Sequence, residues 1–158
     1  LRTLPADASP SQPHDLDLPF RFRASLGGWK LLFASTDWVV PDPVSPVVER
    51  GRYLVEALGH CAECHTPRNA LGGLQRDLWM AGAPAASGPG RVPNITPGGL
   101  SWSVEEMSEY LKSGFTPEFD TAGGEMVEVI KNTRQLSDAD RLAIASYLAA
   151  LPPQGPDS

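Results

Sequence analysis

Apolar residues recur at the spacing of an amphipathic helix in three segments of the chain. The first segment follows Ser45 and Pro46, a helix-capping residue and a proline that suits the first helical position. The second follows Ser103, which forms a capping-box pattern with Glu106, and the third follows Ser137, with acids in its first turn. The apolar faces expected of these helices are Val47, Gly51, Leu54, Val55 and Leu58; Val104, Met107, Tyr110 and Leu111; and Ile144, Tyr147, Leu148 and Leu151. No segment shows the alternation of a strand, so the sequence predicts an all-α domain.

Prolines and glycines interrupt this pattern in two long stretches. Residues 1–44 are predicted to be an extended Pro-rich arm or interdomain linker. Its aromatic patches, Phe20-Arg-Phe-Arg and Trp29-Lys-Leu-Leu-Phe33, pack either on the domain's own surface or against another domain or subunit. Residues 69–100 are predicted to be a long loop, and a loop of this length needs a functional reason, such as wrapping a large cofactor. The helical domain therefore covers residues 45–153, and residues 154–158 form a tail.

The charge of the chain is concentrated in one segment. The formal net charge of the 158 residues is −6, and residues 101–128 hold seven acids and one base, which accounts for all of it. This balance argues against nucleic-acid binding, which favours a basic surface, and against electrostatic adhesion to anionic lipid. The most apolar stretch, residues 26–40, contains Lys30 and Asp37 and is too short to span a bilayer. No signal peptide is visible and the chain opens at Leu1, so we interpret it as a mature or truncated product.

The strongest chemical signal is the run Cys61-Ala-Glu-Cys64-His65. A C-x-x-C-H motif is typical of covalent c-type haem attachment, because two thiols one helical turn apart can add to the two vinyl groups of a haem and the next histidine can then ligate the iron. A zinc site fits less well, since it needs four ligands and only His14 and His60 remain. A thioredoxin-like redox pair also fits less well, because that motif occurs in a βαβ context. The sequence predicts one haem c, attached through both cysteines.

The sixth iron ligand decides between electron transfer and catalysis. A His/Met pair saturates the iron and raises its potential, whereas an open position suits ligand binding or catalysis. Met107 lies on the apolar face of a predicted helix and is interpreted as a core residue, and Met80 is only 15 positions past His65. Met126 is the preferred ligand, because it follows a Gly-Gly pair in a predicted loop, where glycines let the backbone approach a flat ring. The alternative for Met126 is a gap-filling core methionine.

The order of these features resembles a class I cytochrome c over residues 45–153. The resemblance implies the class I cytochrome c fold, here with a Pro-rich N-terminal arm and a long haem-wrapping loop. It implies that the first and last helices cross at a glycine, with Gly51 against Tyr147 and Leu148. It also implies that a proline carbonyl, that of Pro93, holds the proximal histidine and fixes the orientation of its ring.

A narrower resemblance is to haem domains of bacterial periplasmic multihaem cytochromes, including dihaem carriers and the cytochrome subunits of alcohol, gluconate and related dehydrogenases. It rests on three stretches: Arg50-Gly-Arg-Tyr-Leu-Val-Glu-Ala-Leu-Gly-His-Cys with Cys-His-Thr-Pro-Arg68-Asn69; Pro93-Asn-Ile-Thr-Pro; and Gly124-Glu-Met-Val-Glu-Val-Ile-Lys-Asn-Thr-Arg-Gln-Leu-Ser-Asp-Ala-Asp-Arg. Those proteins usually carry two or three C-x-x-C-H motifs, whereas this chain has one. The start, Leu1-Arg-Thr-Leu-Pro5, echoes Leu148-Ala-Ala-Leu-Pro152, so an upstream haem domain is one hypothesis and chance is the other.

Two further side chains are candidates for hydrogen bonds to the haem propionates. Arg68 carries a guanidinium, which pairs well with carboxylates, and Trp102 carries an indole N–H. A plain surface charge for Arg68 and ordinary core packing for Trp102 stay open as alternatives.

The sequence thus predicts an electron carrier rather than an enzyme, working as a domain or subunit of a periplasmic respiratory or dehydrogenase chain. The resemblance implies the periplasm, with membrane association only through a partner or a missing segment. The alternative is a haem enzyme, oxidising a small sulfur anion or acting as a peroxidase, with a weak or displaced sixth ligand. The acidic segment 101–128 ends just past Met126. We expect it to cover the methionine side of the haem and to meet redox partners with a basic docking face.

Overall fold

A computed structural model describes residues 3, 5–16, 18, 21–86 and 88–155. The chain divides into two compact units, Leu1–Ser35 and Thr36–Ser158. The first unit contains α1 (Arg23–Phe33), a helix whose side chains are exposed or half-buried. The expectation of extended structure throughout the arm was therefore wrong over these residues, because no proline occurs in them to stop a helix. Phe20 of the aromatic patch, and Leu1, Arg2 and Leu4 of the N-terminal echo, lie outside the described residues.

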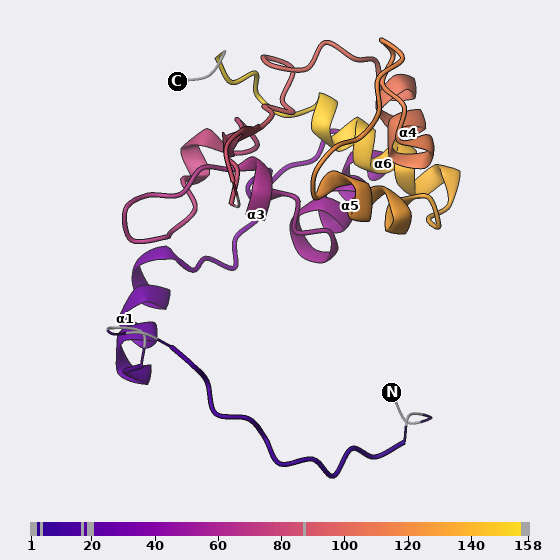
Figure 1. Ribbon diagram of the computed structural model, residues 1–158. Coiled ribbons are helices and arrows are strands. Elements are labelled where there is room, and N and C mark those ends of the chain that lie inside the picture. The colour runs from indigo at the N-terminus through magenta and orange to yellow at the C-terminus, as the bar shows by residue number, and fades with distance from the viewer. Residues whose placement is uncertain (1–2, 4, 17, 19–20, 87, 156–158) are drawn as a thin grey trace. The chain divides into compact units, whose positions relative to one another are not determined.

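The second unit carries the other elements. In chain order they are α2 (Pro46–Arg52), the π-helical turn η1 (Tyr53–Leu58), α3 (Ala62–His65), the 3-10 turn η2 (Arg76–Leu78), β1 (Ala83–Pro84), β2 (Arg91–Val92), α4 (Val104–Ser113), α5 (Met126–Thr133) and α6 (Asp138–Ala149). β1 and β2 pair antiparallel, with Ala83 opposite Val92. Figure 1 shows α4, α5 and α6 gathered on one side of α3, and the connection from α3 to α4 looping out on the other side. The prediction of a helical domain with a long loop after the cysteine motif is confirmed.

The second unit begins at Thr36, ahead of the boundary at residue 45 that the sequence suggested. The difference comes from residues 37–41, which we call the strap. The strap is hydrogen-bonded to side chains of α2 and η1. Arg52 Nη1 donates to the carbonyls of Val40 and Pro41, and the Val39 amide donates to Glu56 Oε2 at 2.8 Å. These charged side chains fix the strap to α2 and η1.

The predicted helix ends are confirmed by their caps. Ser45, Ser103 and Ser137 each accept a hydrogen bond from the backbone amide three residues on, at 3.3, 3.1 and 3.1 Å. Ser103 and Glu106 form a complete capping box. α4 ends at Gly114, whose φ of +83° is the left-handed conformation common after a helix.

The core is centred on the crossing of α2 and α6. A Cβ atom on Gly51 would lie 2.0 Å from the Ala143 carbonyl oxygen and 2.7 Å from Tyr147 Cβ, so only glycine fits at this approach. Tyr147 is fully buried there. The glycine in the middle of the predicted helix therefore has a packing reason, as the resemblance implied. The buried apolar residues of the core are Val48, Leu54, Val55, Ala62, Trp79, Met80, Met107, Leu111, Ile130, Ala143, Ile144, Ala145, Tyr147, Leu148 and Leu151.

Two residues placed on the buried face of the first helix are exposed instead. Val47 is 44% exposed, and its neighbour Val48 takes the buried position. Leu58 is 56% exposed, because it ends the π-helical turn η1, where the wider winding shifts the register of the face.

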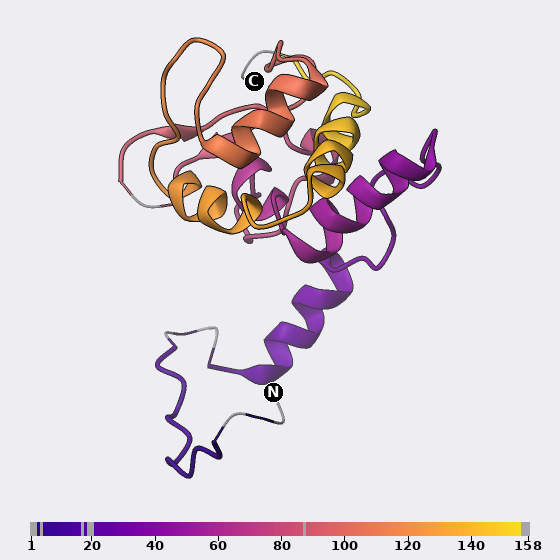
Figure 2. The same ribbon diagram turned by 90° about the vertical axis from the view of Figure 1, so that its right-hand side faces the viewer.

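The segment around Met126 also differs from its prediction. The sequence suggested a loop, but Met126 begins α5, and Ile130 one turn later is buried against the core. The open connection between α4 and α5 stands out as the orange loop in Figure 2. In the part of the chain that the structure describes, no helix is long and apolar enough to cross a membrane.

Candidate functional site

Cys61 is the N-cap residue of the short helix α3, and Cys64 lies within that helix. The amides of Cys64 and His65 both donate to the Cys61 carbonyl, at 3.3 and 3.0 Å, so Cys61 and Cys64 are one helical turn apart. Both are free thiols. Burial raises the pKa of the Cys61 thiol to about 11, which keeps it protonated at neutral pH. The motif thus presents two reduced thiols in the geometry that its spacing predicted.

His65 is oriented by the loop that follows β2. Its Nδ1 lies 2.8 Å from the Pro93 carbonyl oxygen. Because a carbonyl can only accept, Nδ1 carries the proton and Nε2 is left with its lone pair. Burial lowers the pKa of His65, although the hydrogen bond to Pro93 acts in the opposite direction. The neutral imidazole is the form that ligates a metal.

A buried stretch around Met80 fixes the turn that carries His65. The Met80 amide donates to Thr66 Oγ1 at 3.0 Å, and the Met80 carbonyl accepts from the Ile95 amide at 3.0 Å. The Gly82 amide donates to the His65 carbonyl at 2.8 Å. Met80 itself has a φ of +60°, a strained conformation for a bulky residue. Its fully buried side chain is packed within the core.

Asn94 ties the Pro93 loop to the C-terminal end of the unit. Its Oδ1 accepts from the Thr96 amide and hydroxyl, at 2.9 and 2.7 Å. Thr96 Oγ1 in turn accepts from the Gln154 amide at 3.0 Å. The Pro-Asn-Ile-Thr-Pro run was part of the family resemblance, and its polar residues hold the loop that presents the Pro93 carbonyl.

Met126 stands apart from this arrangement. It is the first residue of α5 and is half-buried at the border of the core. A Cβ atom on Gly123 would meet no atom within 4 Å, so packing inside the chain does not explain that glycine. The structure leaves Met126 as a candidate for the sixth ligand, and that role stays a prediction.

Arg68 and Trp102 have partners within the chain. Arg68 pairs with Glu63 and donates to the Gly72 carbonyl at 2.7 Å. Trp102 Nε1 donates to Glu118 Oε1 at 3.2 Å. These contacts use the donors that we assigned to the propionates, so both assignments stay predictions with their alternatives open.

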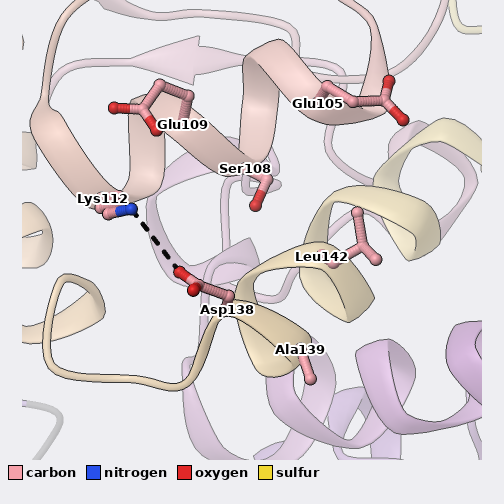
Figure 3. A pocket seen from close by; sticks show the side chains of 7 residues that line it. All are labelled: Glu105, Ser108, Glu109, Lys112, Asp138, Ala139 and Leu142. Atoms are coloured by element: carbon pink, nitrogen blue, oxygen red, sulfur yellow. Dashed lines mark ion pairs between the residues drawn. The ribbon is translucent and has the colours of Figure 1, made fainter.

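The acidic segment is divided between two places. Glu105 and Glu109 lie on α4 and line a depression toward α6, where Lys112 Nζ is 3.7 Å from Asp138 Oδ1 (Figure 3). Glu106 lies on α4 as well, where it forms the capping box with Ser103, and the remaining four acids lie in the connection to α5 and on α5 itself. The expectation of one acidic face over the methionine therefore applies only to this second group, Glu118, Asp120, Glu125 and Glu128.

The residues of the site fit a c-type haem. Two reduced thiols lie one turn apart, and the adjacent imidazole has its Nε2 free for a metal. On α5, Val127 and Val129 are 39% and 41% exposed, apolar surface that is available to a large apolar ligand. Thiol, imidazole and apolar surface are the chemistry that this cofactor requires.

Comparison with known proteins agrees with this fit. The family model described as cytochrome c matches residues 48–152. A protein named diheme cytochrome c-type, from Cereibacter sphaeroides, is 55% identical over 152 residues, which are 96% of this chain and 51% of the relative. The fructose dehydrogenase cytochrome subunit of Gluconobacter japonicus is 43% identical over 155 residues, covering 94% of this chain and 31% of that subunit. The gluconate 2-dehydrogenase cytochrome c subunit of Pantoea cypripedii is 34% identical over 158 residues, covering 91% and 35%. This chain thus spans about half the length, or less, of these relatives.

Proposed function

The chain belongs to the cytochrome c family, and we propose that it transfers electrons through one haem c attached to Cys61 and Cys64, with His65 and Met126 as the axial ligands. The haem, when bound, supplies a one-electron couple whose potential depends on its ligands and surroundings. The protein residues attach it, orient its ligands and shield it from water.

The observation that carries the proposal is the hydrogen bond from His65 Nδ1 to the Pro93 carbonyl, beside two free thiols. This bond fixes the tautomer and aims the unprotonated Nε2 away from the loop. In the part of the chain that the structure describes, Nε2 makes no hydrogen bond. Here the second nitrogen is kept available next to the attachment cysteines.

Met126 is the sixth ligand that the arrangement favours. Met80 and Met107 are 0% and 6% exposed, with their side chains packed in the core. Met126 is half-buried and begins a helix after a Gly-Gly pair, so its thioether is not committed to the core. A His/Met pair raises the reduction potential and leaves no open position, which suits an electron carrier better than an enzyme.

The test is the absorption spectrum and midpoint potential of the holoprotein. We expect one covalent haem per chain by intact mass, and a thioether-to-iron band in the ferric protein. Met126→Ala should remove that band and lower the potential, whereas Met107→Leu, a volume-conserving core change, should keep both. A wild-type ferric protein without the band, or with high-spin iron, would favour the haem-enzyme alternative.

The partner that fits best is a dehydrogenase subunit in the periplasm. Relatives of this chain are cytochrome subunits of fructose and gluconate dehydrogenases. We propose that this haem domain likewise accepts electrons from a dehydrogenase, alone or next to a further haem domain. Reduction of the holoprotein by a purified dehydrogenase, with turnover matched to electrons received, would test this assignment.

A further inference from the structure

Glu56 receives three hydrogen bonds at a point where distant parts of the second unit meet. It is half-buried and lies in the π-helical turn η1. Its Oε1 accepts from the Tyr147 hydroxyl at 2.7 Å, and its Oε2 accepts from the Val39 amide at 2.8 Å. The Val40 amide adds a longer contact to Oε1 at 3.4 Å. π-helical turns are frequently found at functional sites. One carboxylate therefore joins the strap to the last helix.

Two basic residues, Arg52 and Arg76, also fix the strap. Arg52 Nη1 donates to the carbonyls of Val40 and Pro41, each at 2.8 Å. Its guanidinium lies 4.6 Å from the centre of the Trp38 ring. Arg76 Nη2 donates to the Asp37 carbonyl at 2.7 Å. Among these contacts of the strap in the described chain, Glu56 supplies the only negative charge, whereas Arg52 and Arg76 supply positive charges.

The same network continues from Tyr147 toward the histidine ligand. Trp79 Nε1 donates to the Tyr147 hydroxyl at 3.1 Å. Burial, reinforced by Glu56, raises the pKa of Tyr147, so the hydroxyl keeps its proton and donates it to the carboxylate. Trp79 directly precedes Met80, whose amide and carbonyl are bonded to Thr66 and to Ile95. The carboxylate is thus connected, through the side chains of Tyr147 and Trp79 and the backbone of Met80, to both segments that hold His65.

We propose that Glu56 is a positioning residue of the haem site: it clamps the strap and, through Tyr147 and Trp79, supports the His65 turn while its negative charge lowers the reduction potential. This inference rests on the proposed function, because a potential requires a bound haem. A negative charge inside the fold stabilises the ferric form relative to the ferrous form, more strongly the closer it lies to the iron. Tyr147 partly neutralises that charge by donating to it.

Three variants separate the charge from the scaffold. Glu56→Gln removes the charge and should shift the midpoint potential upward, by up to about tenfold in the reduction equilibrium, or about 59 mV for one electron. Glu56→Asp keeps the charge and should bring the potential back toward the wild-type value. Tyr147→Phe keeps the charge but removes its donor, so the potential should shift downward. If the variants only loosened the packing around the site, the midpoint potential would shift in the same direction in Glu56→Gln and in Tyr147→Phe. That result would overturn the proposal.

The matched control is Glu49→Gln on α2. Its carboxylate lies 3.8 Å from Arg52 Nη2 and contacts neither the strap nor Tyr147. We expect its potential to stay at the wild-type value, and an equal shift in both Glu-to-Gln variants would mean that the effect of Glu56 is not specific. Should Glu56→Gln fail to accumulate with haem, Tyr147→Phe decides alone: a downward shift supports the proposal, and no shift or an upward shift refutes it.

Limited proteolysis gives a second readout that does not need the haem. Glu56→Gln should be cleaved within the strap at least several-fold faster than the wild type, because two backbone amides lose a charged acceptor. Unchanged cleavage would refute the clamp. If the wild-type chain proves to carry no covalent haem, the proposed function fails, and strap cleavage in the unloaded protein still decides whether Glu56 is a clamp.

Discussion

The two sides of the site are built in different ways. The histidine half, residues 61–66, 79–82 and 93–96, is joined by hydrogen bonds between segments far apart in the chain. The methionine half, residues 114–129, is bonded mainly within itself, as in the pairing of Thr116 and Asp120. It leaves Phe115, Phe119 and Val129 61%, 95% and 41% exposed. The chain therefore positions the proposed histidine ligand by its own packing, whereas the methionine half has few contacts that would hold one arrangement without a cofactor.

The difference follows from how local stability is distributed. Segments with few buried apolar contacts open at low free energy, and segments tied into the core open only near global unfolding. Thr66 and Met80 are almost completely buried, whereas Met126 is half-buried. We therefore expect a bound haem to stabilise the methionine half more than the histidine half.

Preventing haem attachment should produce the largest effect. Cys61→Ala/Cys64→Ala removes both thiols, so intact mass should show no covalent haem. In this unloaded protein the amides of Met80, Gly82 and Ile95 should stay protected from hydrogen exchange, because their acceptors are inside the fold. Amides of residues 115–129 should exchange at least a hundredfold faster than in the holoprotein, a loss of about 2.7 kcal/mol. Equal loss of protection in both halves would contradict the comparison.

The second largest effect is expected from Gly51→Ala at the helix crossing. The new methyl group would overlap the Ala143 carbonyl oxygen, and such overpacking costs about 1–3 kcal/mol or more. The better helix propensity of alanine offsets about 1 kcal/mol of this. Denaturant unfolding should show the loss both with and without haem.

Gly123→Ala is the matched variant in the methionine half. Its methyl group would meet no atom of the chain within 4 Å, so the unloaded protein should unfold at an unchanged denaturant concentration. If the glycine serves the haem, the holoprotein alone should lose stability or change its spectrum. An unchanged holoprotein would mean that the Gly-Gly pair does not approach the cofactor.

Only part of this organisation could be predicted from the sequence. The helix caps and the crossing at Gly51 follow local rules and a strong family pattern, and they are present as expected. The strap and the Glu56 network could not be predicted, because they join residues up to 91 positions apart with no local signal. The helix at Met126 was missed because the Gly-Gly pair before it suggested a loop, although Ile130 lies one turn further on at helical spacing.

An effect similar in size to that of Gly51→Ala is expected at Arg141, which anchors the end of α5 to α6. Its buried guanidinium donates to the carbonyls of Thr133 and Arg134, at 3.2 and 3.1 Å, and to that of Leu136, and it pairs with Asp138. Arg141→Gln should cost about 1.5–3 kcal/mol, typical of hydrogen bonds to a charged group. Arg141→Lys should recover only part of this, because an ammonium lacks the planar fork. Thermal unfolding measures both, and a full recovery with lysine would show that charge alone is sufficient.

The smallest effect concerns the acids of the methionine half. Glu118, Asp120, Glu125 and Glu128 are exposed, and exposed charges act on a partner over about 30 Å at 0.01 M salt but only about 3 Å at 1 M. Reduction of the holoprotein by a cationic metal complex should therefore slow as salt rises, and reduction by an anionic complex should quicken.

Glu125→Gln should reduce the low-salt rate with the cation by roughly twofold, in the range of one exposed charge pair. Glu49→Gln on α2 should leave this rate unchanged if electrons enter through the methionine half. An equal effect of both variants would mean that only the net charge of the chain matters, and the rate would then carry no information about which half of the site faces the partner.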